Sequence, residues 1–456
     1  MVMLTTINPS TGVKCGEYQL MSREDVMQII AGMHVVWQTW QRSALEVRAG
    51  YLRELAKLLL KERDALAALM TQEMGKPITQ AKSEVEKCAL LCDYYAQNGA
   101  QFLQPELVST EFHKSYSSFQ PLGIIFAIMP WNFPLWQVMR FAVPNLMAGN
   151  AGLLKHAPNV TGTALMIEQL FLTAGFPTGL FRSLVVDVSL APDIIQHPYV
   201  AGVTLTGSER AGKAVASVAG AALKKVVLEL GGSDPYIVLA DADLELAANE
   251  CVLSRLNNAG QVCIAAKRII VVESVKDKLQ ELVLNQAKNY VMGSPNAPDT
   301  MLGPMAREDL RADLHAQVQR AIAAGARCVL GGVLPTGPGY YYPATVLLDV
   351  PVDSPAFREE MFGPVICITG AKDTEEAIAL ANDTDYGLAG AVFTSDIKRG
   401  EVIARDQISA GVCAVNMHVS SDPRLPFGGI KHSGYGRELA RVGMHEFLNI
   451  KTVVVA

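Results

Sequence analysis

The chain has 456 residues, of which 50% are hydrophobic and 18% charged, and this is enough to bury a large core and predicts two domains. Its formal net charge of −6 offers no attraction for nucleic acid or an anionic membrane, so we expect neither partner. No stretch reaches the roughly 20 apolar residues of a membrane-spanning helix, and the first residues lack the pattern of a signal peptide.

Cysteine and histidine are scattered along the chain. The eight cysteines form no CxxC pair, and one close pair, Cys88 and Cys92, has helical spacing. The eight histidines are equally dispersed and form no HExxH motif. The spacing therefore predicts neither a disulfide framework nor a metal site, and it indicates a reducing compartment, which we expect to be the cytoplasm.

The first hundred residues carry helical patterns. Apolar residues recur every three or four positions across residues 26–40, and the pattern continues across residues 45–70. A break at residues 74–77 precedes a third helix, which is predicted to reach about Gln97. We expect these amphipathic helices to form scaffold rather than site.

The pattern changes at Gly123. Short apolar runs, typical of parallel strands covered on both faces, alternate with helical patterns on either side of Gly231-Gly232. Strands are predicted at residues 124–129, 152–154, 184–186, 202–205 and 226–230, and then at 236–239, 268–272, 328–330, 365–369 and 411–416. This alternation predicts a doubly wound α/β fold with a boundary near Gly231-Gly232.

One loop leads into an isolated cysteine. Residues 257–263 read Asn-Asn-Ala-Gly-Gln-Val-Cys and show neither helical nor strand periodicity. We expect a structured loop that holds the Cys263 thiol in a fixed place, as a nucleophile requires. A buried, unreactive cysteine is the other common fate of this residue type, and these seven residues leave both interpretations open.

Two upstream residues complete a candidate site for covalent catalysis. Glu229 lies in an apolar run just before Gly231-Gly232, and Asn132 is fixed between Pro130 and Pro134. A thiol, a carboxylate and a rigid amide can serve as nucleophile, base and hydrogen-bond donor to an oxyanion.

With these motifs the chain resembles the aldehyde dehydrogenase superfamily, whose members oxidise aldehydes to acids with NAD(P). The likeness covers nearly the whole chain, and five family signatures recur in family order. They are residues 130–134, 228–232, 260–263, 360–364 and 426–429. The resemblance makes Cys263 the expected catalytic nucleophile.

The resemblance implies a Rossmann-like cofactor domain, an α/β catalytic domain and a small β oligomerisation element. It assigns residues 1–106 and 121–231 to the cofactor-binding domain and residues 232–432 to the catalytic domain. Residues 107–120 and 433–456 would form the oligomerisation element and the C-terminal tail. We therefore expect a homodimer or homotetramer, assembled through residues 107–120 and 449–455.

A strand-to-helix turn at residues 206–212 is the expected pyrophosphate site. Glycine lets the backbone approach phosphate, and a helix N-terminus favours negative charge. A lone GxxxxG is more typical of a plain turn, and it differs from the GxGxxG of ordinary Rossmann domains. Because aldehyde dehydrogenases use this spacing, the resemblance places Gly207, Ser208 and Gly212 at the cofactor.

Lys155 follows the strand predicted at residues 152–154, where relatives place a lysine near the adenosine ribose. NAD-preferring relatives often carry a glutamate three residues later, and this chain has Pro158. A carboxylate there would repel the 2′-phosphate of NADP. Its absence lets NADP bind but provides no side chain dedicated to holding that phosphate. We expect both NAD and NADP to serve, with NAD somewhat favoured.

Further cofactor contacts follow from the resemblance. Glu360 is expected to hold the hydroxyls of the nicotinamide ribose, and Phe362 to pack against the nicotinamide. Trp131 and Leu230, both within family signatures, are expected beside the cofactor. A helix-end carboxylate and a core aromatic remain the alternative interpretation of Glu360 and Phe362.

The expected reaction is covalent and needs no metal. The Cys263 thiolate attacks the aldehyde, while Asn132 and the Cys263 N–H stabilise the oxyanion of the thiohemiacetal. Hydride loss to the nicotinamide leaves a thioester, which water activated by Glu229 hydrolyses. Leu228 and Leu230 are expected to raise the pKa of the Glu229 carboxyl, although a salt-bridged structural glutamate is the alternative.

Three other functions stay open. A non-catalytic relative that serves as a structural or binding protein need not keep nucleophile, base and amide together, and this chain has all three. A CoA-acylating semialdehyde dehydrogenase would pass the acyl group to coenzyme A, and some such relatives lack the glutamate. A broad-specificity aliphatic aldehyde dehydrogenase would not need a group that binds carboxylate.

Arg140 bears on the substrate. It lies on the helix predicted after the first signature, where succinate-semialdehyde dehydrogenases place an arginine that binds the far carboxylate. Their second arginine is missing, because Asn257 occupies its position, and Ser421 or Arg424 could replace it if Asp422 points away. We expect succinate semialdehyde or a similar short ω-carboxylated aldehyde as substrate, with an ion-paired structural Arg140 as the alternative.

Overall fold

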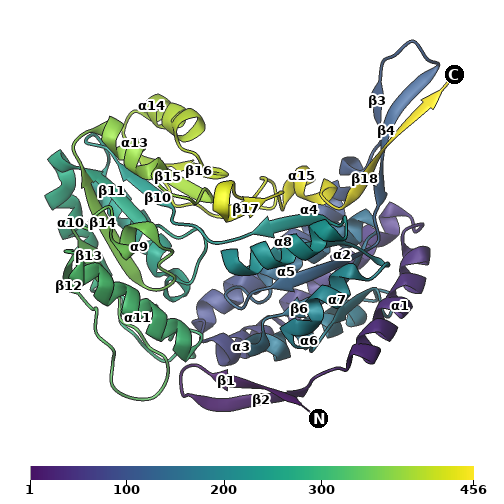
Figure 1. The fold of residues 1–456 in the computed structure, drawn as a ribbon, viewed down its shortest axis with the longest axis horizontal. Coiled ribbons are helices and arrows are strands. Elements are labelled where there is room, and N and C mark those ends of the chain that lie inside the picture. Colours follow the sequence, from purple (N-terminus) through teal and green to yellow (C-terminus); the bar gives the residue numbers. More distant parts are fainter. Residues whose placement is uncertain (1) are drawn as a thin grey trace.

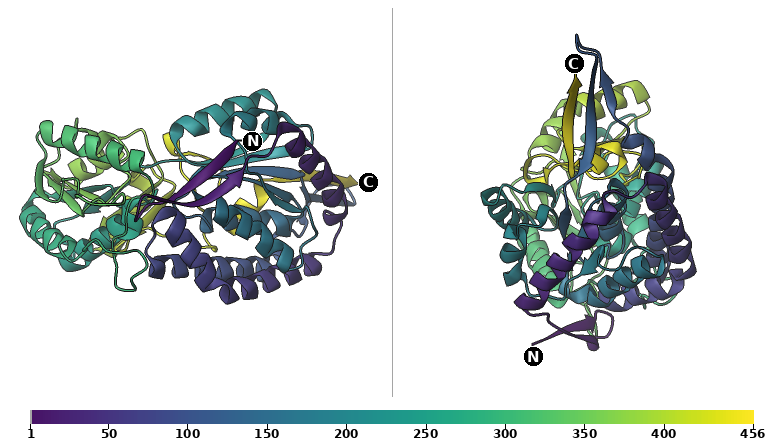
Figure 2. Two further views of the ribbon diagram at one scale, coloured as in Figure 1. Left: turned by 90° about the horizontal axis from the view of Figure 1, so that it is seen from below. Right: turned by 90° about the vertical axis from the view of Figure 1, so that its right-hand side faces the viewer.

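The computed structural model describes residues 2–456. Two α/β lobes are each built on one sheet, and a three-stranded β arm projects from one of them (Figure 1). A hairpin of β1 (Met3–Asn8) and β2 (Val13–Gln19) lies at the opposite end of the same lobe from the arm (Figures 1 and 2). The expected α/β fold with parallel strands and a separate small β element is confirmed.

Four helices follow the hairpin: α1 (Arg23–Trp40), α2 (Leu45–Lys61), α3 (Arg63–Met74) and α4 (Ile78–Phe102). Ser22 caps α1, because its hydroxyl accepts the Asp25 N–H while the Asp25 side chain accepts the Ser22 N–H. The single helical pattern at residues 45–70 is divided at Glu62, whose φ of −92° and ψ of 10° interrupt the helix. The third predicted helix is α4, which runs five residues beyond Gln97.

The first lobe surrounds a six-stranded sheet in the order β17-β9-β8-β5-β6-β7. The strands are β5 (Ile124–Met129), β6 (Ala151–His156), β7 (Phe181–Ser183), β8 (Val200–Thr206), β9 (Lys225–Glu229) and β17 (Gly434–Tyr435). The helices between them are α5 (Trp136–Ala148), α6 (Thr161–Thr173), α7 (Ala191–Gln196) and α8 (Glu209–Ala221). All pairs are parallel except β17 with β9.

The strand predicted at residues 184–186 was wrong by three residues. The ladder between β6 and β7 ends where the Leu184 N–H donates to Leu154 O at 2.7 Å. Beyond it the backbone bonds elsewhere, because Val185 O accepts the Met21 N–H at 2.8 Å. The apolar run at 184–186 is therefore buried under the chain before α1, not within the sheet.

The second lobe surrounds a seven-stranded sheet in the order β12-β13-β14-β11-β10-β15-β16, parallel except for β12. Its strands are β10 (Pro235–Val238), β11 (Arg268–Val272), β12 (Arg327–Leu330), β13 (Thr345–Leu348), β14 (Val365–Ala371), β15 (Ala389–Phe393) and β16 (Val412–Val415). Its helices are α9 (Leu244–Leu256), α10 (Glu273–Ala287), α11 (Glu308–Ala323), α12 (Pro355–Arg358), α13 (Thr374–Asn382) and α14 (Ile397–Val402). The five strands predicted here are confirmed, whereas β13 and β15 were missed.

The arm is an antiparallel sheet of β3 (Glu106–Val108), β4 (Lys114–Pro121) and β18 (Leu448–Val455), the last preceded by α15 (Ala440–His445). Figures 1 and 2 show it standing clear of both lobes. It joins the two segments that were expected to assemble protomers, because Ile450 pairs with Phe119 and Val454 with Ser115. The domain boundaries stay a prediction. Strand β17 lies within residues 433–456, which were assigned to the oligomerisation element and C-terminal tail, but it pairs with β9 of the first lobe.

Short helical turns complete the chain: η1 (Pro158–Val160), η2 (Val188–Leu190), η3 (Asn257–Gly260), η4 (Ile403–Gln407) and η5 (Lys431–Ser433). None of the helices described for residues 2–456 combines the length and apolar character needed to cross a membrane.

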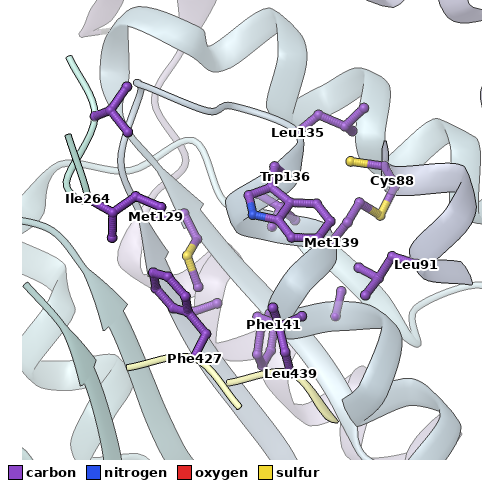
Figure 3. Packing of buried hydrophobic residues seen from close by; sticks show 14 of the residues in the cluster. Cys88, Leu91, Met129, Leu135, Trp136, Met139, Phe141, Ile264, Phe427 and Leu439 are labelled. Carbon is purple, nitrogen blue, oxygen red and sulfur yellow. The ribbon is translucent and has the colours of Figure 1, made fainter. Parts of the chain in front are cut away.

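Helices α4 and α5 form the packed floor on which the candidate site stands. Every residue of α5 is buried, and Figure 3 shows Trp136 and Met139 of α5 packed against Cys88 and Leu91 of α4. Burying one such large apolar side chain stabilises the fold by ~1.5–3 kcal/mol. Polar residues of these two helices that face the site are therefore held in place by a rigid core.

Candidate active site

The loop before Cys263 has an uncommon backbone. Asn258, Ala259 and Gly260 lie consecutively in the left-handed region, with φ of 52°, 52° and 72°. Such a conformation costs a non-glycine residue ~1–3 kcal/mol, so the surroundings must hold it. Gly260 is required here, because a Cβ on it would collide with Gly363 O.

Three side-chain amides hold this loop. Asn132 Nδ2 donates to Gln261 O at 3.1 Å, and Asn258 Nδ2 donates to Asn132 O at 2.8 Å. Gln261 Oε1 accepts the Ala306 N–H at 3.0 Å. Asn132, the amide expected in the site, is therefore buried against the loop that carries the thiol. It contacts this loop at Gln261, two residues before Cys263.

Arg255 supports the same loop from behind. Its side chain is fully buried, and its guanidinium donates to Val365 O at 2.6 Å, to Gly260 O at 3.3 Å and to Met361 O. Three carbonyls occupy its donors. Arg255 therefore fixes the loop and does not replace the arginine that is missing at Asn257.

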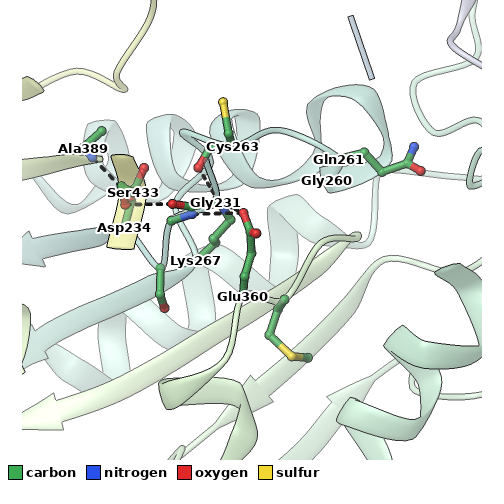
Figure 4. Close-up of polar contacts among 12 residues, drawn as sticks. Gly231, Asp234, Gly260, Gln261, Cys263, Lys267, Glu360, Ala389 and Ser433 are labelled. Atoms are coloured by element: carbon green, nitrogen blue, oxygen red, sulfur yellow. Dashed lines mark hydrogen bonds and ion pairs between the residues drawn. The ribbon is translucent and has the colours of Figure 1, made fainter. Parts of the chain in front are cut away.

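Cys263 is partly buried and lines a cavity of about 550 Å³. Burial raises the pKa of its thiol to about 11, although the positive charges of Lys267 and Arg140 oppose the shift. Figure 4 shows the thiol pointing away from the polar group formed by Lys267 and Glu360. At neutral pH the thiol is therefore protonated, and its activation needs a proton acceptor.

Lys267 connects the cysteine loop with Glu360. Its ammonium group contacts Cys263 O and lies 3.0 Å from Glu360 Oε1. The same carboxylate oxygen accepts the Gly232 N–H at 3.1 Å (Figure 4). Glu360 is thus fixed beside the Gly231-Gly232 turn, and its role at the nicotinamide ribose stays a prediction. Lys267 was not singled out in the sequence.

Glu229 ends β9 with its side chain 2% exposed, and neither carboxyl oxygen has a hydrogen-bond partner among residues 2–456. Desolvation raises its pKa well above the usual range, and Glu438 raises it further, whereas Arg140 and Arg437 oppose the shift. The direction agrees with the expectation from its apolar neighbours. A Cβ on Gly428 would lie 2.6 Å from Glu229 Oε1, so the carboxyl lies against the backbone that follows Phe427, and Glu229 itself does not line the cavity.

Arg140 lines the same cavity as Cys263. Its side chain is 2% exposed, forms an ion pair with Glu438 and lies 4.6 Å from the Phe427 ring centroid. Arg140 is therefore ion-paired and also lines the cavity, and its role as the carboxylate anchor stays a prediction. Glu438, the partner, carried no signal in the sequence.

The two candidates for the second carboxylate contact behave differently. Ser421 lines the cavity. Arg424 does not, because Asp422 binds its guanidinium at 2.8 and 2.6 Å and leaves the side chain 75% exposed. The structure brings Ser421 to Cys263 and Arg140 but leaves Arg424 at the surface.

Lys87 is a cavity residue that the sequence did not single out. It lies on α4, and its ammonium group donates to Ser421 Oγ at 2.8 Å and lies 4.2 Å from the Trp136 ring centroid. It follows Gln80, Ser83 and Glu84 on the same polar face of α4, and all four residues line the cavity. The complete cavity wall is formed by Lys76, Gln80, Ser83, Glu84, Lys87, Phe133, Trp136, Gln137, Arg140, Leu253, Ser254, Asn257, Val262, Cys263, Ile264, His418, Val419, Ser420, Ser421 and Phe427.

A second group of predicted residues gathers at the carboxyl ends of the first sheet. Ser208 caps α8 by accepting the Ala211 N–H at 3.3 Å, directly after β8. Gly212 permits close packing, because a Cβ there would lie 2.6 Å from Leu230. Lys155 near the end of β6 is buried, which lowers its pKa, while Asp187 opposes that shift.

Trp131 and Phe362 lie edge to face, with ring centroids 5.8 Å apart, in a small apolar cluster with Val160 and Ala306. The expected cofactor residues therefore fall into one group at the sheet edge and one around Trp131, Phe362 and Glu360. Within residues 2–456 no three His, Cys, Asp or Glu side chains are grouped so that they could bind a metal ion.

The model of the aldehyde dehydrogenase family matches residues 2–453. The chain belongs to this family. It is 48% identical, over 98% of its length and 97% of the relative, to succinate semialdehyde dehydrogenase [NAD(P)+] of Escherichia coli strain K12.

Solved structures of the family have the same fold. The structure of succinic semialdehyde dehydrogenase from Streptococcus pyogenes with NADP+ matches with a TM-score of 0.97 and 38% identity, over 99% of each chain. That of an NAD-dependent aldehyde dehydrogenase from Sinorhizobium meliloti matches with a TM-score of 0.96 and 33% identity, over 100% of this chain and 91% of that one. Family membership thus rests on the whole chain.

Proposed function

We propose that this aldehyde dehydrogenase oxidises succinate semialdehyde, or a similarly short ω-carboxylated aldehyde, to the dicarboxylic acid with reduction of NAD or NADP. The observation that carries the proposal is a single cavity whose wall contains both Cys263 and Arg140. A thiol can attack an aldehyde and a guanidinium can bind a carboxylate, so the cavity can hold both ends of one small molecule. The names of the E. coli and S. pyogenes relatives support this substrate.

In the first chemical step the Cys263 thiol gives up its proton to solvent water, and the thiolate Sγ forms a bond with the aldehyde carbon while the carbonyl π electrons move to the oxygen. The carbonyl oxygen becomes an oxyanion, which the Asn132 amide and the Cys263 N–H stabilise by hydrogen bonds. Removing one such donor typically slows catalysis by a factor of ~10²–10³. Asn132 supports this assignment because its side chain is fixed against the cysteine loop by bonds at 3.1 and 2.8 Å.

The second step releases the acid. Loss of hydride from the thiohemiacetal leaves a thioester on Cys263, and a water molecule attacks its carbonyl carbon. Glu229 accepts the proton of this water, and the thiol of Cys263 is restored. The raised pKa of Glu229 supports the role, because a carboxyl group with an ordinary pKa would be too weak a base.

The residues present fit a dinucleotide cofactor. Thr206 Oγ1, at the carboxyl end of β8, is buried without a hydrogen-bond partner among the described residues. Lys155 is a buried lysine near the carboxyl end of β6, which is separated from β8 by β5. A crevice at the carboxyl ends of parallel strands is the usual dinucleotide site. Gly207 and Ser208 would hold the pyrophosphate, Lys155 the adenosine ribose and Glu360 the nicotinamide ribose.

The bound nicotinamide supplies the hydride acceptor. Phe362 and Trp131 would pack beside its ring, with Leu230 and Gly212 shaping the floor below the cofactor. Pro158 leaves no carboxylate at that position to repel a 2′-phosphate, and the relatives include both NADP- and NAD-dependent enzymes. We therefore assign both cofactors and keep the modest preference for NAD as a prediction.

The protein would act as a homodimer or homotetramer. Residues 107–120 and 449–455 form one projecting sheet whose exposed apolar side chains include Leu107 at 74% and Ile450 at 59%. Apolar groups on a projecting sheet favour burial against another protomer. The eight cysteines are all free thiols, which fits a reducing compartment such as the cytoplasm.

Initial rates with an aldehyde panel test the function. The panel contains succinate semialdehyde, butanal, benzaldehyde and betaine aldehyde, each with NAD and with NADP, in the presence and absence of coenzyme A. We expect the highest kcat/KM for succinate semialdehyde without coenzyme A. Equal values across the panel would indicate a broad-specificity enzyme, a requirement for coenzyme A an acylating one, and no reduced cofactor from any aldehyde a non-catalytic protein.

A further inference from the structure

One basic side chain of the cavity wall lacks an acidic partner. Three of the four basic side chains of the wall have an acidic partner, whereas Lys87 has no carboxylate within 4 Å among residues 2–456. The pairs are Lys76 with Glu84, Arg140 with Glu438, and His418 with Glu250. Lys87 is therefore the one basic side chain of the wall that is not in contact with a carboxylate among the described residues.

The surroundings of Lys87 are those of a binding group. Its ammonium group has one hydroxyl partner, Ser421 Oγ at 2.8 Å, and one aromatic neighbour, the Trp136 ring at 4.2 Å. An ammonium ion has three N–H donors, so these two contacts leave it short of acceptors. Partial burial without a counter-ion is unfavourable, and an anion in the cavity would remove that penalty.

Arg140, in contrast to Lys87, already has a buried counter-ion. Its buried ion pair with Glu438 is neutral as a unit, although a guanidinium can still donate hydrogen bonds to a second carboxylate. The substrate that we propose carries one negative charge at the end far from its aldehyde. The one unpaired cation and the one anionic end therefore match in number.

We propose that Lys87 binds the far carboxylate of the substrate together with Ser421 and Arg140, and that it replaces the second arginine whose position is taken by Asn257. The inference rests on the proposed function and adds a residue that determines specificity. It gives Ser421 a definite part, because the hydroxyl that accepts a hydrogen bond from Lys87 has its own O–H to donate to a carboxylate. The carboxylate would lie between α4 and the loop before Phe427.

The proposal has a consequence for pH. Burial lowers the pKa of Lys87 to about 8, with a further lowering by Arg140 of α5 and opposite effects from Cys88 and Glu84 of α4 and Asp422 of the loop. The ammonium form binds a carboxylate, and the neutral amine that forms above this pKa does not. Affinity for carboxylated substrates should therefore fall as the pH rises from 7 to 9.5, whereas affinity for butanal has no such dependence on Lys87.

The test compares Lys87→Met and Lys87→Arg with the wild type on succinate semialdehyde and butanal. Loss of one charge-assisted contact should lower the ratio of kcat/KM for succinate semialdehyde to that for butanal by about 10- to 100-fold in Lys87→Met, mainly through KM. Lys87→Arg keeps the charge and should recover most of the ratio. Lys82→Met is the matched control, because Lys82 lies on the same helix, pairs with Asp64 and is outside the cavity.

A second measurement uses the unmodified enzyme, so the proposal stays testable if a variant does not fold. Succinate should inhibit butanal oxidation competitively, and its inhibition constant should rise about 30-fold between pH 7 and pH 9.5. An inhibition constant that stays flat, or an unchanged ratio in folded Lys87→Met, overturns the role of Lys87. If the wild type itself does not prefer succinate semialdehyde to butanal, the proposed function fails instead, and the two failures are thereby distinguished.

Discussion

Arg140 acts on several groups at once. It pairs with Glu438, faces the cavity, and its charge opposes the raised pKa values of both Glu229 and Cys263. Removing the guanidinium would leave the buried Glu438 carboxylate without its partner. Losing one member of a buried pair typically costs about 3–5 kcal/mol, much of it from the charge left behind.

Arg140→Ala should therefore slow the enzyme with every aldehyde and lower the preference for succinate semialdehyde over butanal by about 10- to 100-fold. Activity falls with every aldehyde because, without the guanidinium, the pKa of Glu229 rises and a smaller fraction of Glu229 is ionised. Arg140→Ala combined with Glu438→Gln removes both charges of the pair and should recover butanal oxidation but not the preference. Steady-state kinetics of the wild type and both variants checks this, and a preference that survives in both would make Arg140 structural.

Glu229→Gln should form the thioester but hydrolyse it slowly. We expect a burst of reduced cofactor of about one equivalent per active site, followed by turnover slower than wild type by a factor of ~10²–10⁴. Because the pKa of Glu229 is raised, its basic form is populated only as the pH rises through that pKa. Wild-type steady-state turnover should therefore increase with pH, and the increase should be absent from the variant.

Stopped-flow absorbance of the reduced cofactor separates the burst from the steady state. Mass spectrometry of the quenched variant should find the acyl group on Cys263. Steady-state turnover equal to that of the wild type would remove Glu229 from the mechanism.

The backbone of the loop that ends at Cys263 depends on the glycine at position 260. Gly260→Ala would place a Cβ against Gly363 O at a φ of 72°, and a left-handed conformation alone costs alanine ~1 kcal/mol. We expect a lower free energy of unfolding and loss of most activity, since Cys263 follows three residues later. Gly220→Ala in α8 is the control, because nothing lies within 4 Å of its Cβ, and it should leave stability unchanged or raise it.

Thermal unfolding and kcat of the two glycine variants make this comparison. A stable and fully active Gly260→Ala would show that the loop tolerates a different backbone.

Periodicity and turn residues predicted most elements, because long amphipathic helices and buried strands carry their pattern in consecutive residues. The prediction failed where partners from elsewhere decide the outcome. Residues 184–186 are apolar enough for a strand, yet the backbone of Val185 is bonded to Met21. The break at Glu62 is likewise invisible in a pattern that continues across it.

The same division applies to the candidate site. Cys263, Glu229 and Asn132 could be identified because each lies within a short local motif. Glu438 and Lys87 could not, because their importance comes from burial and from partners far along the chain, such as Arg140 and Ser421. Arg424 was chosen for its charge, and the neighbouring Asp422 already satisfies that charge.

At the scale of the whole molecule, the projecting arm should carry the contact between protomers. Ile450→Glu places a charge on its exposed apolar surface, where burial against a partner would require desolvation of that charge. We expect the mass measured by light scattering to fall to that of a smaller assembly. Val13→Glu, on the exposed hairpin at the other end of the lobe, is the control and should leave the mass unchanged. A wild type that is monomeric would contradict the assignment.

The protonated thiol of Cys263 also bears on how the enzyme withstands oxidants. Peroxides, alkylating agents and disulfides react with thiolates, and thiols are nearly inert towards them. With a pKa of about 11, only roughly one molecule in 10⁴ would carry the thiolate at pH 7. We therefore expect these reagents to inactivate the resting enzyme slowly at pH 7 and faster as the pH rises, and each catalytic cycle needs an acceptor for the thiol proton.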